Sequence, residues 1–262
     1  MKGTGWSEEQ RKLAFHLYCQ LPFGRLHHRA PEIIELAGLI GRTPSAVAMK
    51  LVNFASLDPA VTGTGRKGLS GASEGDRETW REFHADWEGL AFDCARLLEE
   101  LRARHADRPD VVSEDFDSYV PADFTGETRQ ALVEQRVRQR FFRRAVLSSY
   151  HGRCCMSGLS EPRLLNASHI IPWSEDAKNR LNPSNGLCLS AIHDRAFDQH
   201  LVSLSEDLRI LVGSELKRRS EEPLIEKAFL SLEGREIEPP WRFRPDPTFL
   251  ASHREAFMRL NP

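Results

Sequence analysis

The chain has 262 residues, of which 40% are hydrophobic and 28% are charged, as in a soluble globular protein longer than one average domain. No apolar run approaches the roughly 20 residues that cross a bilayer, which excludes a helical membrane protein. The N-terminal segment MKGTGWSEEQRK has no apolar core of a signal peptide. Five cysteines, a small and odd number, argue against a disulfide framework. We therefore expect a cytoplasmic protein with no membrane partner.

The net charge of −2 hides a strong segregation of charge along the chain. Residues 107–127 carry seven acidic side chains against one arginine, and residues 129–153 carry seven arginines against one glutamate. A binding face depends on local charge and not on the sum. The composition therefore does not exclude a polyanionic partner such as nucleic acid.

Residues 5–58 have the pattern of three short helices. Ser7 is a plausible N-cap of the first helix, whose apolar residues recur at three-and-four spacing. The second helix begins near Pro31 and ends before Gly41. The third begins at Thr43 or Ser45 and runs through SAVAMKLVNFASLD. Three helices with a Gly-Arg-Thr turn before the last are typical of a helix-turn-helix unit.

Two stretches, WSEE at 6–9 and LAGLIGRTPSAVAMKL across the second and third helices, resemble a divergent Myb/SANT-type tri-helical module. This resemblance implies that the third helix contacts DNA phosphates and the groove. The residues that would do so are Arg42, Thr43, Ser45 and Lys50. The alternative is a small helical bundle used for protein contacts.

The next segments are a loop, a helix and a linker. Residues 59–80 are rich in Gly and Ser and predict a loop, and residues 76–104 predict one helix with an apolar face. Residues 105–126 have no periodicity and many Asp and Pro residues, which predicts a linker. An acidic arm that mimics DNA and shields the basic segment is an alternative for this stretch.

The basic segment after residue 127 predicts a helix. Val137, Phe141 and Val146 belong to its apolar stripe, so one face packs on a core. We expect four arginines of this helix to contact phosphates, namely Arg136, Arg140, Arg143 and Arg144. The alternative is a solvated face without a partner.

The segment ASHIIPW, residues 167–173, places His169 in a short apolar strand. By itself this residue could be an ordinary core histidine. Downstream, however, Asn185-Gly186 opens a second strand, and a His-Asp pair, His193 and Asp194, lies on the following helix. A ββα unit with this distribution of residues can bring a base and a metal ligand together. The alternation LVSLSEDLRILV after it predicts a hairpin.

Residues 150–200, with CCMSG, ASHIIPW, NPSNGLCL and HDRAFD, resemble the HNH (ββα-metal) nucleases, and most closely a subgroup found in restriction and antiphage defence. The resemblance implies hydrolysis of phosphodiester bonds in double-stranded DNA, with 5′-phosphate and 3′-hydroxyl products and one Mg²⁺ or Mn²⁺ per active site. His169 would be the general base, because an imidazole titrates near neutral pH. Asn185 would orient the imidazole or brace the loop.

The sequence departs from the usual HNH pattern at the metal site. Ser168 stands where an acid or a second histidine precedes the base, and Asp194 stands in the column of the usual metal-binding histidine. Both Asp194 and His193 remain candidate metal ligands, and Ser168 is a third candidate at the metal site; His193 is also a candidate catalytic residue. Adjacent helical residues point about 100° apart, so both are not expected on one metal. Asp198, one turn beyond Asp194, would support it.

The cysteines do not form intact zinc knuckles, because Ser157, Ser190 and His193 occupy positions of the two CxxC pairs. We therefore do not expect structural Zn²⁺. These departures keep open a second function, a DNA-binding or regulatory protein on an inactive HNH scaffold. A third, an RNA nuclease or secreted toxin, has less support because no secretion signal is visible.

The predicted fold class is α+β. We expect a helical, HTH/SANT-like DNA-binding domain at residues 1–104, an acidic linker at 105–127, and an HNH nuclease domain at 128–262 whose C-terminal segment wraps the core. Cutting both strands with one active site per chain would favour a homodimer.

Overall fold

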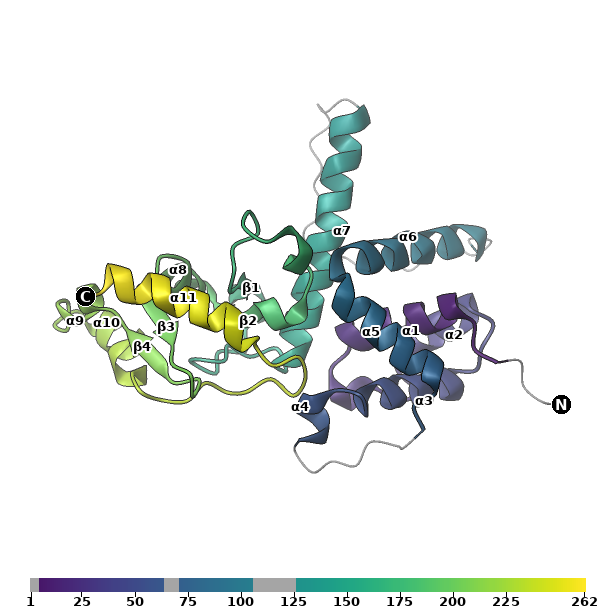
Figure 1. Cartoon of the computed structure of the whole chain (residues 1–262), viewed down its shortest axis with the longest axis horizontal. Coiled ribbons are helices and arrows are strands. Elements are labelled where there is room, and N and C mark those ends of the chain that lie inside the picture. The colour runs from purple at the N-terminus through teal and green to yellow at the C-terminus, as the bar shows by residue number, and fades with distance from the viewer. Residues whose placement is uncertain (1–4, 64–70, 106–125) are drawn as a thin grey trace.

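A computed structural model describes residues 5–63, 71–105 and 126–262, with the backbone alone for residues 126–134. Two lobes lie side by side, and a long helix, α7 (Gly126–Ser149), stands between them (Figure 1). The N-terminal lobe is helical, whereas the C-terminal lobe contains two small sheets and short helices. The mixed α+β class is therefore confirmed. The expected acidic linker lies almost wholly outside the described residues.

The first three helices follow their sequence signals. They are α1 (Glu8–Gln20), α2 (Pro31–Leu39) and α3 (Pro44–Ala55). Ser7 forms a capping box with Gln10 at the start of α1, and Thr43, rather than Ser45, caps α3 by accepting a hydrogen bond from the Ala46 amide. Gly41 has φ +65°, a conformation that glycine adopts without a steric penalty, and it ends α2.

The prediction that residues 76–104 are largely helical is confirmed, although the helix is divided in two, whereas the loop predicted over 59–80 is helical at both of its described ends. The chain forms α4 (Pro59–Thr62), α5 (Glu74–Ala85) and α6 (Trp87–His105). Ser73 caps α5 by a capping box with Asp76, so the helix begins two residues before the predicted start. Asp86 has a non-helical backbone, and its side chain accepts a hydrogen bond from the Gly89 amide, which separates α5 from α6.

The C-terminal lobe contains the predicted ββα unit. Strands β1 (Leu165–His169) and β2 (Gly186–Ser190) are antiparallel, with His169 opposite Gly186, and α8 (Ala191–Asp198) packs on both. The predicted hairpin is confirmed as β3 (Val202–Leu204) with β4 (Ile210–Val212). The helices α9 (Ser214–Lys217), α10 (Pro223–Ala228) and α11 (Pro247–Leu260) complete this lobe.

Four 3-10 turns shape the loops around the sheets. They are η2 (Pro162–Leu164), η3 (Ala177–Asn179), η4 (Pro183–Asn185) and η5 (Leu230–Leu232), and η1 (Phe23–Arg25) lies in the N-terminal lobe. η3 and η4 belong to the connection between β1 and β2. This connection therefore has defined structure next to His169.

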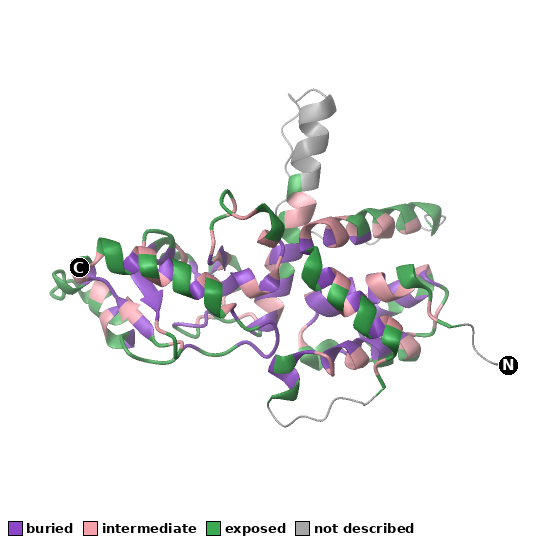
Figure 2. Cartoon of the chain, viewed as in Figure 1, coloured by how far each residue is buried: buried purple, intermediate pink, exposed green. Residues whose placement is uncertain are grey.

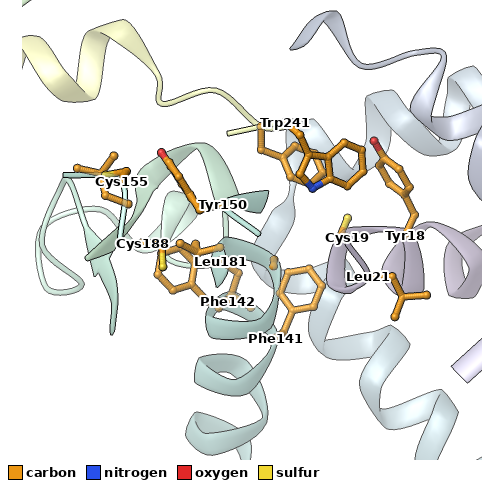
Figure 3. Close-up of a cluster of buried hydrophobic side chains, with 14 of the residues drawn as sticks. Tyr18, Cys19, Leu21, Phe141, Phe142, Tyr150, Cys155, Leu181, Cys188 and Trp241 are labelled. Atoms are coloured by element: carbon orange, nitrogen blue, oxygen red, sulfur yellow. The ribbon is translucent and has the colours of Figure 1, made fainter. Parts of the chain in front are cut away.

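The two lobes share a hydrophobic core across α7 (Figure 2). Phe141 of α7 stacks on His16 of α1, with ring centroids 4.9 Å apart, while Phe142 faces the ββα unit (Figure 3). Arg242, in the segment before α11, is fully buried and donates to the carbonyl oxygens of Tyr18 and Cys19. The segment before α11 thus joins the C-terminal lobe to α1 of the helical lobe. No helix in the described parts of the chain has the length and apolarity needed to cross a membrane.

Candidate active site

His169 is the last residue of β1, and three neighbours hold its ring. The ring stacks on Phe142, with centroids 3.9 Å apart and planes 9° apart, and Trp173 meets it edge-on at 5.5 Å. The Nε2 atom lies 2.9 Å from the carbonyl oxygen of Arg180. This imidazole is therefore fixed in both position and orientation.

The contact with Arg180 determines which nitrogen of His169 is basic. A carbonyl oxygen only accepts hydrogen bonds, so Nε2 carries the proton and Nδ1 carries the lone pair when the ring is neutral. Burial lowers the pKa of His169, although the Arg180 carbonyl and the charge of Asp194 act in the opposite direction. The ring is thus neutral near pH 7 and can accept a proton at Nδ1.

Asn185 is buried at the end of η4, directly before β2, and braces the connection between the strands. Its Oδ1 accepts from the Ile171 amide at 2.8 Å, and its Nδ2 donates to the carbonyl oxygens of Ile171 and Asn179, each at 3.2 Å. Of the two roles that the sequence left open, the structure thus supports bracing. The carbonyl that orients His169 belongs to Arg180, the residue after Asn179.

Asp194 lies in the first turn of α8 and faces the same cavity as His169. Its Oδ2 accepts a hydrogen bond of 2.6 Å from Asn166 Nδ2, and Asn166 lies on β1. Its charge acts on the pKa values of both His169 and Asp198. Asp194 therefore provides a carboxylate, held by the neighbouring strand, near the candidate base.

His193 points away from this cavity into a different pocket of about 430 Å³. Its Nδ1 lies 2.6 Å from Ser190 Oγ and 3.9 Å from Cys154 Sγ, and its Nε2 lies 2.8 Å from the Ala228 carbonyl oxygen. Burial opposes its charge, but the Cys154 and Ala228 contacts outweigh that effect and raise its pKa. The expected catalytic and metal-binding roles of His193 do not fit this placement, because adjacent helical residues face different directions.

The contact with His193 also affects the Cys154 thiol. Burial disfavours the thiolate, but hydrogen bonds from His193 and Ser157 lower the pKa of Cys154 to about 6. Among residues 5–63, 71–105 and 126–262, no three His, Cys, Asp or Glu side chains gather in a way that could hold a metal ion. The Cys154–His193 pair is instead a polar contact under α10.

Ser168 and Asp198 complete the expected set around Asp194, and both line the cavity that contains His169. The Ser168 hydroxyl is buried and has no hydrogen-bond partner within the described parts of the chain. The side chain of Asp198 is largely exposed. Its pKa is raised, first by the partial loss of solvent around its carboxylate and second by the negative charge of Asp194. Asp198 is thus close enough to interact electrostatically with Asp194.

The cavity is a large groove, called here the central groove, with a volume of about 2580 Å³. It runs between the helical lobe, α7 and the ββα unit. The α7 arginines that were expected to contact phosphates all line it, namely Arg136, Arg140, Arg143 and Arg144. Arg143 donates to the Leu165 carbonyl oxygen at 2.8 Å, so it also holds the start of β1. Three glutamates of α2 and α6 also line the groove, namely Glu32, Glu35 and Glu99, and Glu35 and Glu99 form ion pairs with Arg102.

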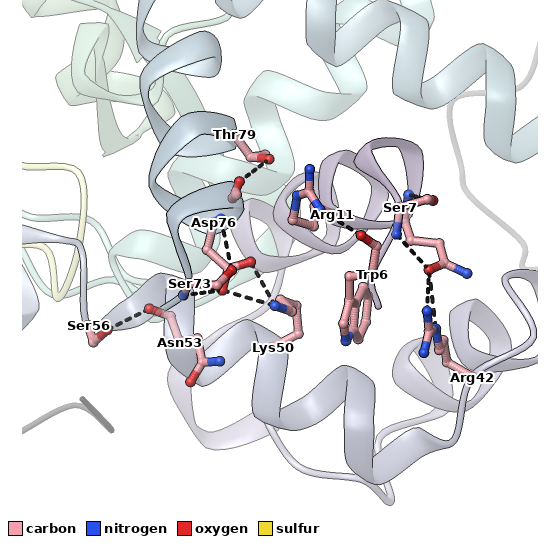
Figure 4. A network of polar contacts seen from close by, with 12 residues as sticks. Trp6, Ser7, Arg11, Arg42, Lys50, Asn53, Ser56, Ser73, Asp76 and Thr79 are labelled. Atoms are coloured by element: carbon pink, nitrogen blue, oxygen red, sulfur yellow. Dashed lines mark hydrogen bonds and ion pairs between the residues drawn. The ribbon is translucent and has the colours of Figure 1, made fainter. Parts of the chain in front are cut away.

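The third helix does not present Lys50 to a ligand. Lys50 is 7% exposed, and its Nζ lies 2.7 and 2.9 Å from the two carboxylate oxygens of Asp76, which is fully buried (Figure 4). The Trp6 ring covers the same ammonium at 4.9 Å. The expected phosphate contact of Lys50 is therefore corrected to an internal ion pair that joins α3 to α5.

The other three candidate residues of this unit differ in their accessibility. Arg42 donates to the Gln10 side chain at 2.9 Å and lies over the Trp6 ring (Figure 4). Thr43 is the N-cap of α3. Ser45 is exposed. The Myb/SANT resemblance therefore stays a prediction, with a smaller basic face than the sequence indicated.

Three neighbours of the site were missed in the sequence. The Arg180 carbonyl had no signal, because backbone atoms leave no residue pattern. Phe142 was assigned only to the apolar stripe of α7, and Asn166 is a polar residue two positions before Ser168. The alternation of side chains along β1 places Asn166 on the same face as Ser168, which is the one signal that could have found it.

Residues 154–205 match the family model described as HNH endonuclease, which spans His169, Asn185 and Asp194. No curated protein matches the chain. The matched segment coincides with β1, β2, α8 and β3. The C-terminal lobe is therefore similar to HNH endonucleases, and this similarity indicates nuclease activity in general terms.

Proposed function

We propose that the protein is a metal-dependent endonuclease that hydrolyses phosphodiester bonds of double-stranded DNA. The observation that carries this proposal is the orientation of His169, whose Nε2 is bonded to the Arg180 carbonyl oxygen while its ring lines the central groove with Asp194. A neutral imidazole in a groove with several arginines has the properties of a general base acting on a polyanion.

The residues around Asp194 fit a hard divalent cation such as Mg²⁺ or Mn²⁺. Such ions bind through one or two carboxylates and keep water and substrate phosphate oxygens as their other ligands. Asp194 supplies the carboxylate, and Ser168, whose hydroxyl has no hydrogen-bond partner among the described residues, lines the same groove. When bound, the ion would neutralise charge at the scissile phosphate and the leaving oxygen.

The chain's own groups account for the remaining steps. Nδ1 of His169 takes the proton from the attacking water, while the bond from Nε2 to the Arg180 carbonyl oxygen keeps the ring in place. Asn166 fixes the Asp194 carboxylate, and Asn185 holds the loop that carries the orienting carbonyl. Arg140 and Arg144 on α7 contact the DNA backbone and position the scissile strand.

The biological role that we propose is restriction or antiphage defence, in line with the resemblance of the HDRAFD-type motif to that subgroup. The N-terminal helices would position the enzyme on DNA, and Arg42, Thr43 and Ser45 are the candidate contacts. A homodimer would cut both strands, because each chain holds one candidate site.

The test is plasmid cleavage in Mg²⁺, Mn²⁺ or EDTA, with wild type, His169→Ala and Asp194→Asn. His105→Ala is the matched control, because His105 is an exposed histidine at the end of α6. We expect metal-dependent nicking by wild type and the control. Loss of a general base typically costs about 10²–10⁴-fold in rate, so we expect that reduction for His169→Ala.

Modified and unmodified plasmids compared in the same assay would show whether base modification directs cleavage. DNA binding without cleavage by wild type, in either metal and on both plasmids, would contradict the nuclease proposal. That outcome would favour the inactive, regulatory scaffold.

A further inference from the structure

Glu88, in the first turn of α6, lies between α7 and the loop that follows β1. Its Oε1 is 3.8 Å from Arg138 Nη1 and 4.0 Å from Arg180 Nη1. Its other oxygen, Oε2, is buried without a hydrogen-bond partner within the described parts of the chain. This carboxylate therefore depends on the two guanidinium groups, and α6 also packs on η3.

Arg180 connects this carboxylate to His169 in two ways. Its carbonyl oxygen accepts the Nε2 proton of His169, and its Nε donates to the Trp173 carbonyl oxygen at 2.7 Å. The guanidinium lies 5.3 Å from the Trp173 ring, which meets the His169 ring edge-on. A displacement of the Arg180 side chain would thus move both the carbonyl and the ring that hold the imidazole.

We propose that Glu88 is a positioning residue, through which the helical lobe holds Arg180 and thereby the catalytic orientation of His169. The proposal rests on the proposed nuclease function, and it goes beyond it because Glu88 lies outside the matched HNH segment. It makes the activity of the C-terminal lobe depend on the docking of α6. Asn185 holds the same loop from the strand side, so Glu88 is the contribution of the other lobe.

The test compares Glu88→Gln, Arg180→Met and the double variant in the full chain. Glu100→Gln is the matched control, because Glu100 lies on the same helix and also pairs with an arginine, Arg104, at 3.6 Å. Single-turnover cleavage at saturating plasmid and the Kd for the same DNA are measured separately. Hydrogen exchange of the peptide covering residues 171–185 is followed in each protein, with residues 191–200 as an internal reference.

We expect Glu88→Gln to lower the single-turnover rate by about fivefold, the ratio that a partly exposed ion pair supports. The Kd for DNA should stay within about twofold, since Glu88 has no contact with substrate. Glu88→Gln should have no further effect in the Arg180→Met background, because both changes break one connection. In Glu88→Gln, the rate of hydrogen exchange should rise in residues 171–185 and stay unchanged in the reference peptide, residues 191–200.

Equal rates and equal exchange for Glu88→Gln and Glu100→Gln would overturn the proposal. So would a loss of DNA affinity with an unchanged rate at saturation, because Glu88 would then act on binding. If wild type does not cleave, the nuclease function fails, and hydrogen exchange alone decides whether Glu88 holds the loop.

Discussion

Replacing Lys50 by methionine tests whether this lysine is part of the protein interior or of a DNA-binding face. The substitution keeps the length of the side chain and removes its charge, which leaves the fully buried carboxylate of Asp76 without its cation. Within the described parts of the chain, that carboxylate then keeps the hydrogen bond that its Oδ2 accepts from the Ser73 amide. A buried charge that has lost its partner is strongly destabilising.

The magnitude follows from the burial of the pair. Removing one partner of a buried ion pair costs about 3–5 kcal/mol, against about 0–1 kcal/mol for an exposed pair. For a chain of this size, about 1 kcal/mol shifts Tm by roughly 2–4 °C, so Lys50→Met should lower Tm by roughly 6–20 °C. The double variant Lys50→Met with Asp76→Asn should recover part of the loss, because the orphaned charge is gone.

The assay is thermal unfolding followed by circular dichroism, together with DNA binding measured well below Tm. Lys12→Met is the control, because Lys12 pairs with Glu8 and Glu82 but is 21% exposed. We expect a large Tm shift for Lys50→Met, a small one for Lys12→Met, and unchanged DNA affinity for both. An unchanged Tm with a lower DNA affinity for Lys50→Met would refute the buried-pair interpretation.

Three further predictions concern the lobe interface and the candidate site. Burial, with the charges of nearby arginines, lowers the pKa of His16 to about 3. As the pH falls, His16 is therefore protonated in the unfolded chain before it is protonated in the folded protein. Stability should therefore be full above about pH 6.5 and fall at lower pH by at most about 1.4 kcal/mol per pH unit. Urea unfolding at several pH values gives the free energy of unfolding as a function of pH, and this free energy should depend less on pH in His16→Gln than in wild type. An equal pH dependence in the two proteins would contradict the prediction. Gly186→Ala places a Cβ atom 2.3 Å from Val146 Cγ2, so we expect a loss of about 1–3 kcal/mol and a lower cleavage rate; wild-type stability would show that β2 and α7 can separate. Asn185→Ala leaves buried polar groups of the loop without partners, which should cost about 1–3 kcal/mol and raise hydrogen exchange in residues 171–179, and unchanged exchange would argue against the bracing role.

Local signals were enough to predict several elements. Capping residues and apolar periodicity act within one or two turns, so Ser7 and Pro31 correctly marked the starts of α1 and α2. The alternation in LVSLSEDLRILV likewise predicted the β3–β4 hairpin. The break at Asp86 was missed, because the apolar stripe continues across it in the sequence.

The candidate site was predicted in its residue types but only partly in its arrangement. The sequence placed His169 on a strand, Asn185 in the connection, and His193 and Asp194 on a helix, because those assignments depend on nearby residues. It could not decide between His193 and Asp194, since the rotation of α8 on the sheet depends on packing. The structure puts Asp194 in the central groove and His193 beside Cys154.

By itself, the amino-acid sequence determined the ββα pattern, the basic helix and the position of the candidate base His169 on a strand, because each depends on residue identity and short-range order. Only the tertiary structure decided that Lys50 is paired inside the protein, that a backbone carbonyl orients His169, and that Glu88 reaches the loop of the other lobe. The physical reason is that burial and ion pairing depend on which surfaces meet. Glu88 and Arg180 are far apart in the chain, and the packing of α6 against η3 brings them together.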